Sequence, residues 1–190
     1  MIYYDYSLLD FYKRILIINV PTTERDPFLG GERENTLSFN FRVGKVYIPT
    51  NMTVKSYYDK QMSSKAGLCA SIIVEEILHD SMLLESGEHI NPTQNAVFFI
   101  LHEIHHYKHL KKYIKRGYSW VEFKEDYQNE EDILANSLPL NDDEQSQSAT
   151  MPSIMKASIL YRKHSFERAA DLFAVQKIMR YEKYRKHFKE

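Results

Sequence analysis

The pattern of hydrophobic and polar positions divides the chain into a β-rich first third and a helical remainder. Residues Phe11–Val20 end in a dense apolar run that stops at Pro21, and this predicts a strand. Residues Leu37–Pro49 alternate apolar and polar positions on both sides of Val43-Gly44, which predicts a β-hairpin. The segment between them, Thr22–Asn35, contains proline, adjacent glycines and charged residues, so we expect a loop there.

The rest of the chain has helical periodicity. Apolar residues recur at helical spacing over Ser64–Glu85, and Gly87 is suited to cap that helix. A second helix is predicted to begin at Asn91-Pro92-Thr93-Gln94, because asparagine suits the N-cap, proline the first turn and glutamine the capping-box position. We expect this helix to run to about Arg116 and to end at Gly117.

Three further segments complete the chain. A short helix is predicted around Trp120–Phe123. Residues Gln128–Thr150 are acidic and then rich in serine and glutamine, with Pro139 among them, so we expect a surface loop with a helical turn at its start. From Pro152 onward the helical pattern returns, with a break predicted at His164-Ser165.

Composition and charge fit one globular domain that spans residues 1–190. The chain is 43% hydrophobic and 27% charged, which is ordinary for a folded protein. Its net charge of −1 gives no general argument for binding to nucleic acid or to an anionic membrane. The single cysteine, Cys69, cannot form an internal disulfide, and the N-terminus has no basic region followed by an apolar one. We therefore expect a cytoplasmic protein.

The segment His102-Glu103-Ile104-His105-His106 is an HExxH motif on the second predicted helix. Residues four apart share one face of a helix, so His102 and His106 can bind the same zinc ion. Glu103 lies about 100° around the helix from His102, where its carboxylate can accept a proton from a water molecule at the metal. The apolar run before the motif predicts a buried setting, which favours zinc catalysis. We expect one Zn²⁺ per chain as cofactor and Glu103 as the catalytic base.

A second motif lies downstream, at Glu167-Arg168-Ala169-Ala170-Asp171. HExxH followed by ExxxD resembles the gluzincin metallopeptidases, and the stretch ERAADLFA resembles the ImmA/IrrE family. The same ExxAD form also resembles the HtpX-like peptidases, which are embedded in membranes, but no membrane-spanning segment is visible in this sequence. The resemblance implies that Glu167 is the third metal ligand and that Asp171 orients a ligand histidine from behind.

The resemblance also implies a fold and an activity. The fold is α+β and zincin-like, with a small antiparallel sheet packed against the HExxH helix and a C-terminal ligand helix. The activity is zinc-dependent hydrolysis of peptide bonds in a protein or peptide substrate, such as a regulatory protein. By analogy of fold, Lys45–Pro49 is expected to be the sheet edge that binds an extended substrate. Gluzincin sites often carry a His, Tyr or Arg that stabilises the oxyanion, and His164, Tyr161 and Arg168 are the candidates.

One segment and two alternatives stay open. Because Gln128–Thr150 lies in sequence between the two halves of the motif, we expect it to act as a lid or steric gate over the zinc site, with a passive surface insertion as the alternative. The first alternative is a zinc-binding regulatory or toxin-like interaction module with weak or no peptidase activity. The second is contact with nucleic acid through the basic, aromatic segment Tyr181–Phe188, for which a solvated helix end is the better interpretation.

Overall fold

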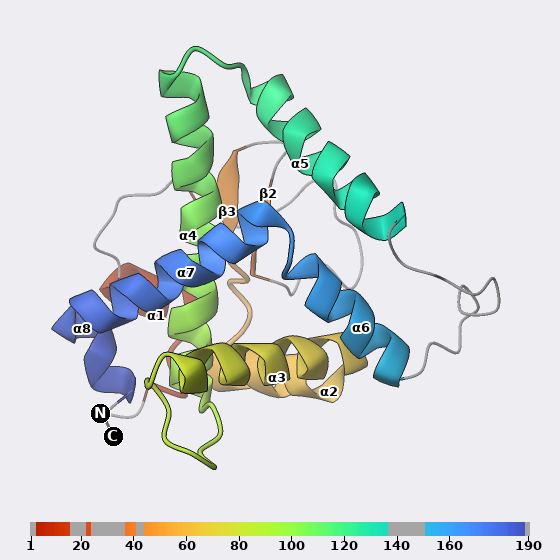
Figure 1. Cartoon of the computed structure of the whole chain (residues 1–190). Helices are drawn as coiled ribbons and strands as arrows, with labels where there is room; N and C mark the ends of the chain where they lie inside the picture. The colour runs from red at the N-terminus through yellow and green to blue at the C-terminus, as the bar shows by residue number, and fades with distance from the viewer. Residues whose placement is uncertain (1–2, 16–21, 24–36, 41–43, 137–150, 189–190) are drawn as a thin grey trace.

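The computed structural model describes residues 3–15, 22–23, 37–40, 44–136 and 151–188 of the chain (Figure 1). Helices dominate these residues, and a small sheet accompanies them. The elements are α1 (Leu8–Ile15), β1 (Thr22–Thr23), β2 (Ser38–Asn40), β3 (Lys45–Tyr47), α2 (Val54–Ser63), α3 (Lys65–Asp80), α4 (Pro92–Lys115), α5 (Trp120–Asn136), α6 (Met151–Tyr161), α7 (Ser165–Arg180), α8 (Glu182–Arg185) and a 3-10 turn (Lys186–Phe188).

The described strands form one sheet in the order β1-β3-β2. β2 and β3 pair in antiparallel register, with Phe39 opposite Val46, which confirms the predicted hairpin. Gly44 has a φ of +63° just before β3, a conformation that glycine adopts without steric cost. β1 runs parallel to β3 on its other side. The expectation that Lys45–Pro49 forms an edge is therefore wrong, because β3 lies between two strands and β2 lies at an edge.

Helix α1 corrects the strand predicted over Phe11–Val20. Its buried side chains are Leu8, Phe11, Tyr12 and Ile15, which recur at spacings of three and four residues and so share one face of a helix. The dense apolar run that suggested a strand belongs partly to residues 16–20, which lie outside the described residues.

Helix α4 begins as its sequence predicts. The side chain of Asn91 accepts the backbone N–H groups of Thr93 and Gln94, and the side chain of Gln94 accepts the N–H of Asn91. This capping box satisfies three backbone donors that would otherwise lack partners at the helix start. The helix ends at Lys115, and Gly117 follows with a φ of +92°, as expected. The first half of α4 is almost wholly buried, so the helix passes through the core.

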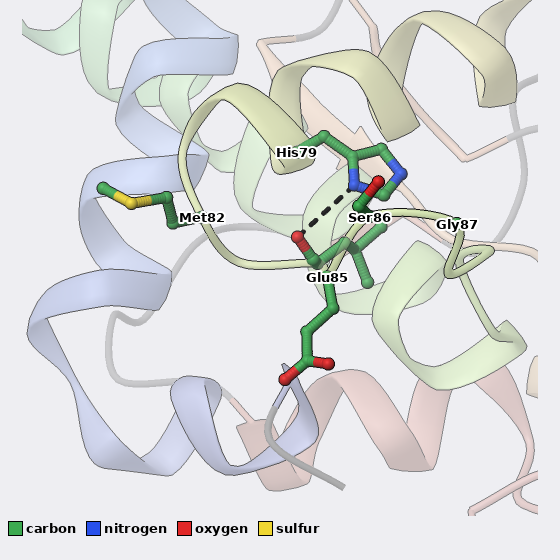
Figure 2. A pocket seen from close by; sticks show the side chains of 6 residues that line it. His79, Met82, Glu85, Ser86 and Gly87 are labelled. Atoms are coloured by element: carbon green, nitrogen blue, oxygen red, sulfur yellow. Dashed lines mark hydrogen bonds between the residues drawn. The ribbon is translucent and has the colours of Figure 1, made fainter.

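The helix predicted over Ser64–Glu85 ends earlier than expected. It begins at Lys65 with Ser64 as N-cap, but it ends at Asp80, and Met82 follows in a left-handed conformation with its side chain 89% exposed. The next turn surrounds a pocket in which the His79 ring lies 3.3 Å from the carbonyl oxygen of Leu84 (Figure 2). Gly87 has a φ of +87° in this turn rather than at the helix end.

Helix α5 is longer than the short helix predicted at Trp120–Phe123. It continues to Asn136, so the first residues of the loop predicted over Gln128–Thr150 are helical. Within α5 only Phe123 and Tyr127 are buried, and the scarcity of apolar anchors explains why the acidic pattern suggested a loop. Residues 137–150 of that predicted loop lie outside the described residues.

The last third is helical, and the predicted break at His164-Ser165 is confirmed by the boundary between α6 and α7. Helix α7 crosses α4 and makes its most extensive packing with it (Figure 1). Ala170 and Ala174 are fully buried, and their small side chains allow the two helices to approach closely. This crossing brings the two sequence motifs together. Among the described residues, no helix is long and apolar enough to cross a membrane.

Candidate metal centre

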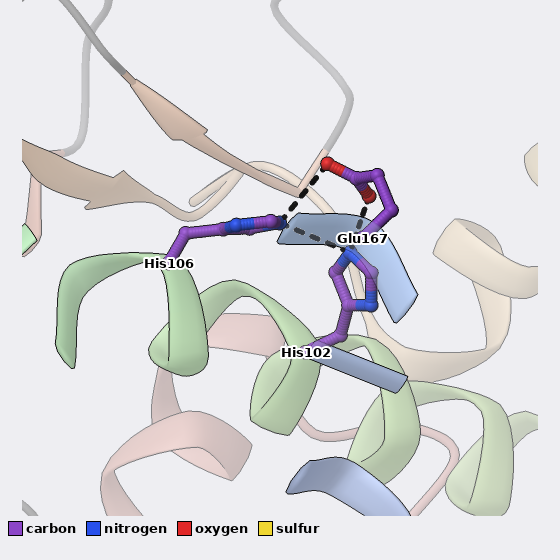
Figure 3. Close-up of side chains that lie close together, drawn as sticks. All are labelled: His102, His106 and Glu167. Carbon is purple, nitrogen blue, oxygen red and sulfur yellow. Dashed lines mark hydrogen bonds and ion pairs between the residues drawn. The ribbon is translucent and has the colours of Figure 1, made fainter. Parts of the chain in front are cut away.

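The crossing of α4 and α7 places two histidines and a glutamate at one buried point (Figure 3). His102 and His106 project from the same face of α4 because they are four residues apart. Glu167 projects from the first turn of α7 toward them. One ligand atom of each residue, an imidazole nitrogen or a carboxylate oxygen, lies within 4.8 Å of the other two. These three residues form a cluster that could hold a metal ion.

The distances within the cluster are short. The Nε2 atoms of His102 and His106 are 3.2 Å apart. The carboxylate of Glu167 straddles both rings, with Oε2 3.0 Å from Nε2 of His102 and Oε1 3.3 Å from Nε2 of His106. All three side chains are buried. Two imidazole nitrogens and a carboxylate therefore face a common centre from which bulk water is excluded.

Asp171 stands behind His102 on the side away from the cluster. Its Oδ1 lies 2.9 Å from Nδ1 of His102, which fixes that nitrogen as a donor because an ionised carboxylate can only accept. The guanidinium of Arg162 also donates to Asp171, and it lies 5.9 Å from the ring centroid of Phe99. Asp171 is thus held from two sides, and the His102 ring is oriented with Nε2 toward the cluster.

A pair of tyrosines supports Glu167. The hydroxyl of Tyr127 on α5 donates to Oε1 of Glu167 at 2.9 Å and lies 3.0 Å from the hydroxyl of Tyr161 at the end of α6. Burial and the nearby Glu167 carboxylate raise the pKa of both tyrosines, so both hydroxyls keep their protons. Burial alone would raise the pKa of Glu167, but His106 and His102 hold it well below its usual range. Glu167 is therefore an ionised carboxylate with fixed orientation.

Glu103 lies beside the cluster without joining it. Its Oε1 is 3.9 Å from Nε2 of His102, and its Oε2 accepts the backbone N–H of Phe39 from β2 at 2.5 Å. Burial raises the pKa of Glu103, although the two histidines oppose the shift. A carboxylate whose pKa moves toward neutrality is better suited to accept a proton and then release it. The contact with β2 thus fixes the position of Glu103, the residue that follows the first histidine of HExxH.

The donor chemistry of the cluster fits a cation. Since Nδ1 of His102 donates to Asp171, a neutral His102 presents a lone pair from Nε2 to the carboxylate of Glu167. Two acceptors at this distance repel unless a proton or a metal lies between them. Burial lowers the pKa of His102, but Asp171 and Glu167 raise it to about 9, so a proton occupies this position at neutral pH when no metal is bound.

The formal charges of the site also favour a bound cation. Glu103, Glu167 and Asp171 bring three negative charges into the site, and Arg162 brings one positive charge. If a metal replaced the proton on His102, both histidines would be neutral and these groups would leave two buried negative charges. Buried charge is costly unless it is paired or bound to a metal. A divalent cation would balance this set.

The three candidate oxyanion residues lie in different places. The hydroxyl of Tyr161 belongs to the hydrogen-bonded chain that ends on Glu167. His164 is fully buried, caps the N-terminus of α7, and lies with Nε2 3.0 Å from the carbonyl oxygen of Tyr127. Arg168 is exposed and lines a cavity beyond Asp171, between α3, α6 and α7.

Sequence reasoning missed three groups of this site: Tyr127, Arg162 and the backbone N–H of Phe39. Tyr127 and Glu167 are hydrogen-bonded but lie 40 residues apart in the sequence. The residues around Tyr127 are acidic, so the sequence did not predict that Tyr127 would be buried. Arg162 lies nine residues before Asp171, a separation that only the turn between α6 and α7 closes. The Phe39 contact depends on which edge of the sheet faces α4, and alternation within a strand does not specify that choice.

Comparisons of the chain with protein-family models, with curated proteins and with solved structures found no match.

Proposed function

We propose that the chain is a zinc-dependent endopeptidase of the gluzincin type, related in its mechanism to the ImmA/IrrE peptidases that its two motifs resemble. The observation that carries the proposal is the buried convergence of His102, His106 and Glu167 with Glu103 beside them. A metal site alone would not require Glu103. A carboxylate next to the ligands, but outside the set that binds the metal, is what hydrolysis needs.

The donor set supports zinc as the metal. Two imidazole nitrogens and one carboxylate oxygen are the protein ligands of a well-known type of catalytic zinc site, which keeps a further position for water or substrate. His102 and His106 would bind through Nε2, and Glu167 through its carboxylate. Bound there, zinc would supply Lewis-acid activation of water and of the substrate carbonyl. Asp171 would hold the His102 tautomer that leaves Nε2 free for the metal.

The residues of the chain account for the proton transfers. Glu103 accepts a proton from the water molecule as its oxygen bonds to the carbonyl carbon of the scissile peptide. The same carboxyl group then delivers that proton to the amide nitrogen, the C–N bond breaks, and an amine and a carboxylic acid are released. Of the three oxyanion candidates, we retain Tyr161, because its hydroxyl lies near the ligand carboxylate; it would stabilise an oxyanion by turning its O–H from Tyr127 to the substrate.

The test is hydrolysis of an unfolded protein substrate, such as fluorescently labelled casein, by the zinc-loaded chain and by its Glu103→Gln variant. Glutamine can still accept the N–H of Phe39 through its amide oxygen, but its nitrogen cannot take a proton from water. We expect zinc content to stay unchanged and the rate to fall at least about 100-fold. Hydrolysis by Glu103→Gln within a few-fold of the parent rate would rule out Glu103 as the base.

One observation favours a second candidate, a zinc-binding interaction module without peptidase activity. An oxygen of Glu103 already accepts the N–H of Phe39, so the carboxylate has a structural partner besides any catalytic role. On this view Glu103 serves only to fix β2 on α4. The parent chain would then bind zinc without cleaving casein, and Glu103→Ala would lower the free energy of unfolding by about 1 kcal/mol relative to Glu103→Gln.

A further inference from the structure

A cavity of about 650 Å³ lies between α3, α6 and α7, beyond Asp171 as seen from the metal cluster. Its volume falls within the range typical of small-molecule sites, roughly 300–1,000 Å³. Its wall combines apolar and charged side chains. The apolar ones are Ile73, Ile77, Ile159, Leu172 and Val175.

The apolar side chains that line the cavity range from buried to exposed. Ile73 and Val175 are buried, whereas Ile159 is 44% exposed and Leu172 is 53% exposed. Two large aliphatic side chains that line the cavity, one from α6 and one from α7, are therefore exposed to water. A ligand with a hydrocarbon portion would remove this surface from water, which is favourable in proportion to the area covered.

Three cations line the same wall: Arg162, Lys163 and Arg168. Arg162 is occupied, because it donates to Asp171. Within the part of the chain that the structure describes, neither Lys163 nor Arg168 has a carboxylate within ion-pair distance. The remaining carboxylate on the wall is Asp80, at the end of α3. Two unpaired cations thus outweigh one carboxylate, and the available positive charge sits beside the exposed aliphatic pair.

We propose that this cavity binds a small amphipathic carboxylate, a molecule with a hydrocarbon portion and one carboxylate group. The hydrocarbon would lie against Leu172, Ile159 and the buried floor, and the carboxylate would bind Lys163 and Arg168. The two cations favour a ligand with an anionic group, and the exposed aliphatic side chains favour a ligand with a hydrocarbon portion. Two sources carry this chemistry: a medium-chain fatty acid, and a peptide C-terminus that ends in aliphatic residues. Binding there would need no metal at His102, His106 and Glu167, although Asp171, which contacts His102, also lines the cavity.

The test is calorimetric titration of the intact chain with decanoate, with 1-decanol and with the dipeptide N-acetyl-Leu-Leu. We expect one saturable site for a carboxylate, with decanol binding at least tenfold more weakly. Preference for decanoate identifies a fatty acid as the source, and preference for N-acetyl-Leu-Leu identifies a peptide C-terminus. Binding of decanol as tight as that of either carboxylate, or no binding of any of the three, would overturn the proposal.

Matched variants locate the site. The double variant Lys163→Ala/Arg168→Ala should weaken binding of the carboxylate at least tenfold, whereas Lys156→Ala/Arg180→Ala removes two exposed cations from α6 and α7 that do not line the cavity and should not weaken it. Leu172→Ser should also weaken binding, while Met179→Ser, another exposed apolar position on α7, should leave it unchanged. Equal affinities in the variants and their controls would place the carboxylate elsewhere and contradict the proposal.

Discussion

At the scale of single residues, the site is controlled by the groups that stand behind its ligands. His102 is oriented by Asp171, and Glu167 is held by Tyr127. The first contact binds Nδ1 of His102, which faces away from the common centre, whereas Tyr127 donates to Oε1 of Glu167, the oxygen that also faces His106. Both contacts fix the orientation of a side chain in the cluster, an arrangement that raises the affinity of a site for metal.

Tyr127→Phe tests this support of Glu167. The variant keeps the ring and loses the hydroxyl that donates to Glu167, so we expect zinc affinity to fall about 10- to 100-fold with little change in fold. Zinc affinity can be measured by competition with a chromogenic chelator. The matched control is Tyr113→Phe, which loses a hydroxyl that donates to Asp126 at the surface. Equal affinities in the two variants would show that Tyr127 does not support the metal site.

His109 gives a residue-scale prediction about pH. Its ring packs against Phe166, and its buried Nδ1 has no hydrogen-bond partner among the described residues. Burial, followed by the charges of His106, Lys112 and Arg116, lowers the pKa of His109 from 6.5 to about 4. The protonated ring is therefore disfavoured in the folded chain.

The sign of the effect on stability follows from that lowered pKa. Between about pH 6.5 and about pH 4 the unfolded chain binds a proton at His109 that the folded chain does not, so acidification favours unfolding. His109→Phe keeps an aromatic ring without the titrating group. We expect its free energy of unfolding, measured by urea denaturation, to fall less than that of the parent between about pH 7 and about pH 5. An equal or larger fall in the variant would contradict this role of His109.

At the scale of elements, α4 could be predicted well and α1 and α5 could not. Local capping chemistry at Asn91 determines where α4 starts, and such signals are contained in a few neighbouring residues. Helix α1 is short, and its helical spacing was obscured by the apolar run that follows it. Helix α5 is anchored by only two buried side chains, so its burial depends on packing that no local pattern contains.

The capping box of α4 should stabilise the whole domain without touching the metal. Asn91→Ala removes the acceptor for two backbone N–H groups, so we expect a loss of about 1 kcal/mol in the free energy of unfolding. Asn91→Ser keeps a capping side chain and should recover most of that loss. Zinc affinity should be equal in both variants, since His102 lies about three turns further along the helix. A large difference in zinc affinity would show that the helix start and the site are coupled.

At the scale of the whole molecule, the site is assembled from β2, α4, α5, α6 and α7. Sequence reasoning named His102, Glu103, His106, Glu167 and Asp171, because they lie in two short motifs with helical spacing. It missed the supporting groups because their contacts bridge separate elements, and the spacing within one element carries no information about such contacts. The fold class, helices with a small sheet, followed from periodicity, whereas the order of the strands did not.

The most direct test of the candidate metal centre is the metal content of the purified chain beside that of Glu167→Ala, measured by elemental mass spectrometry after equilibration with a zinc buffer and desalting. We predict about one zinc per parent chain and nearly none in Glu167→Ala, because losing one of three ligands removes much of the affinity. The control Glu130→Ala, which removes a carboxylate bonded to Ser165 beside the site, should retain zinc. Parent chain without zinc, or Glu167→Ala with a full equivalent, would contradict the metal centre described above.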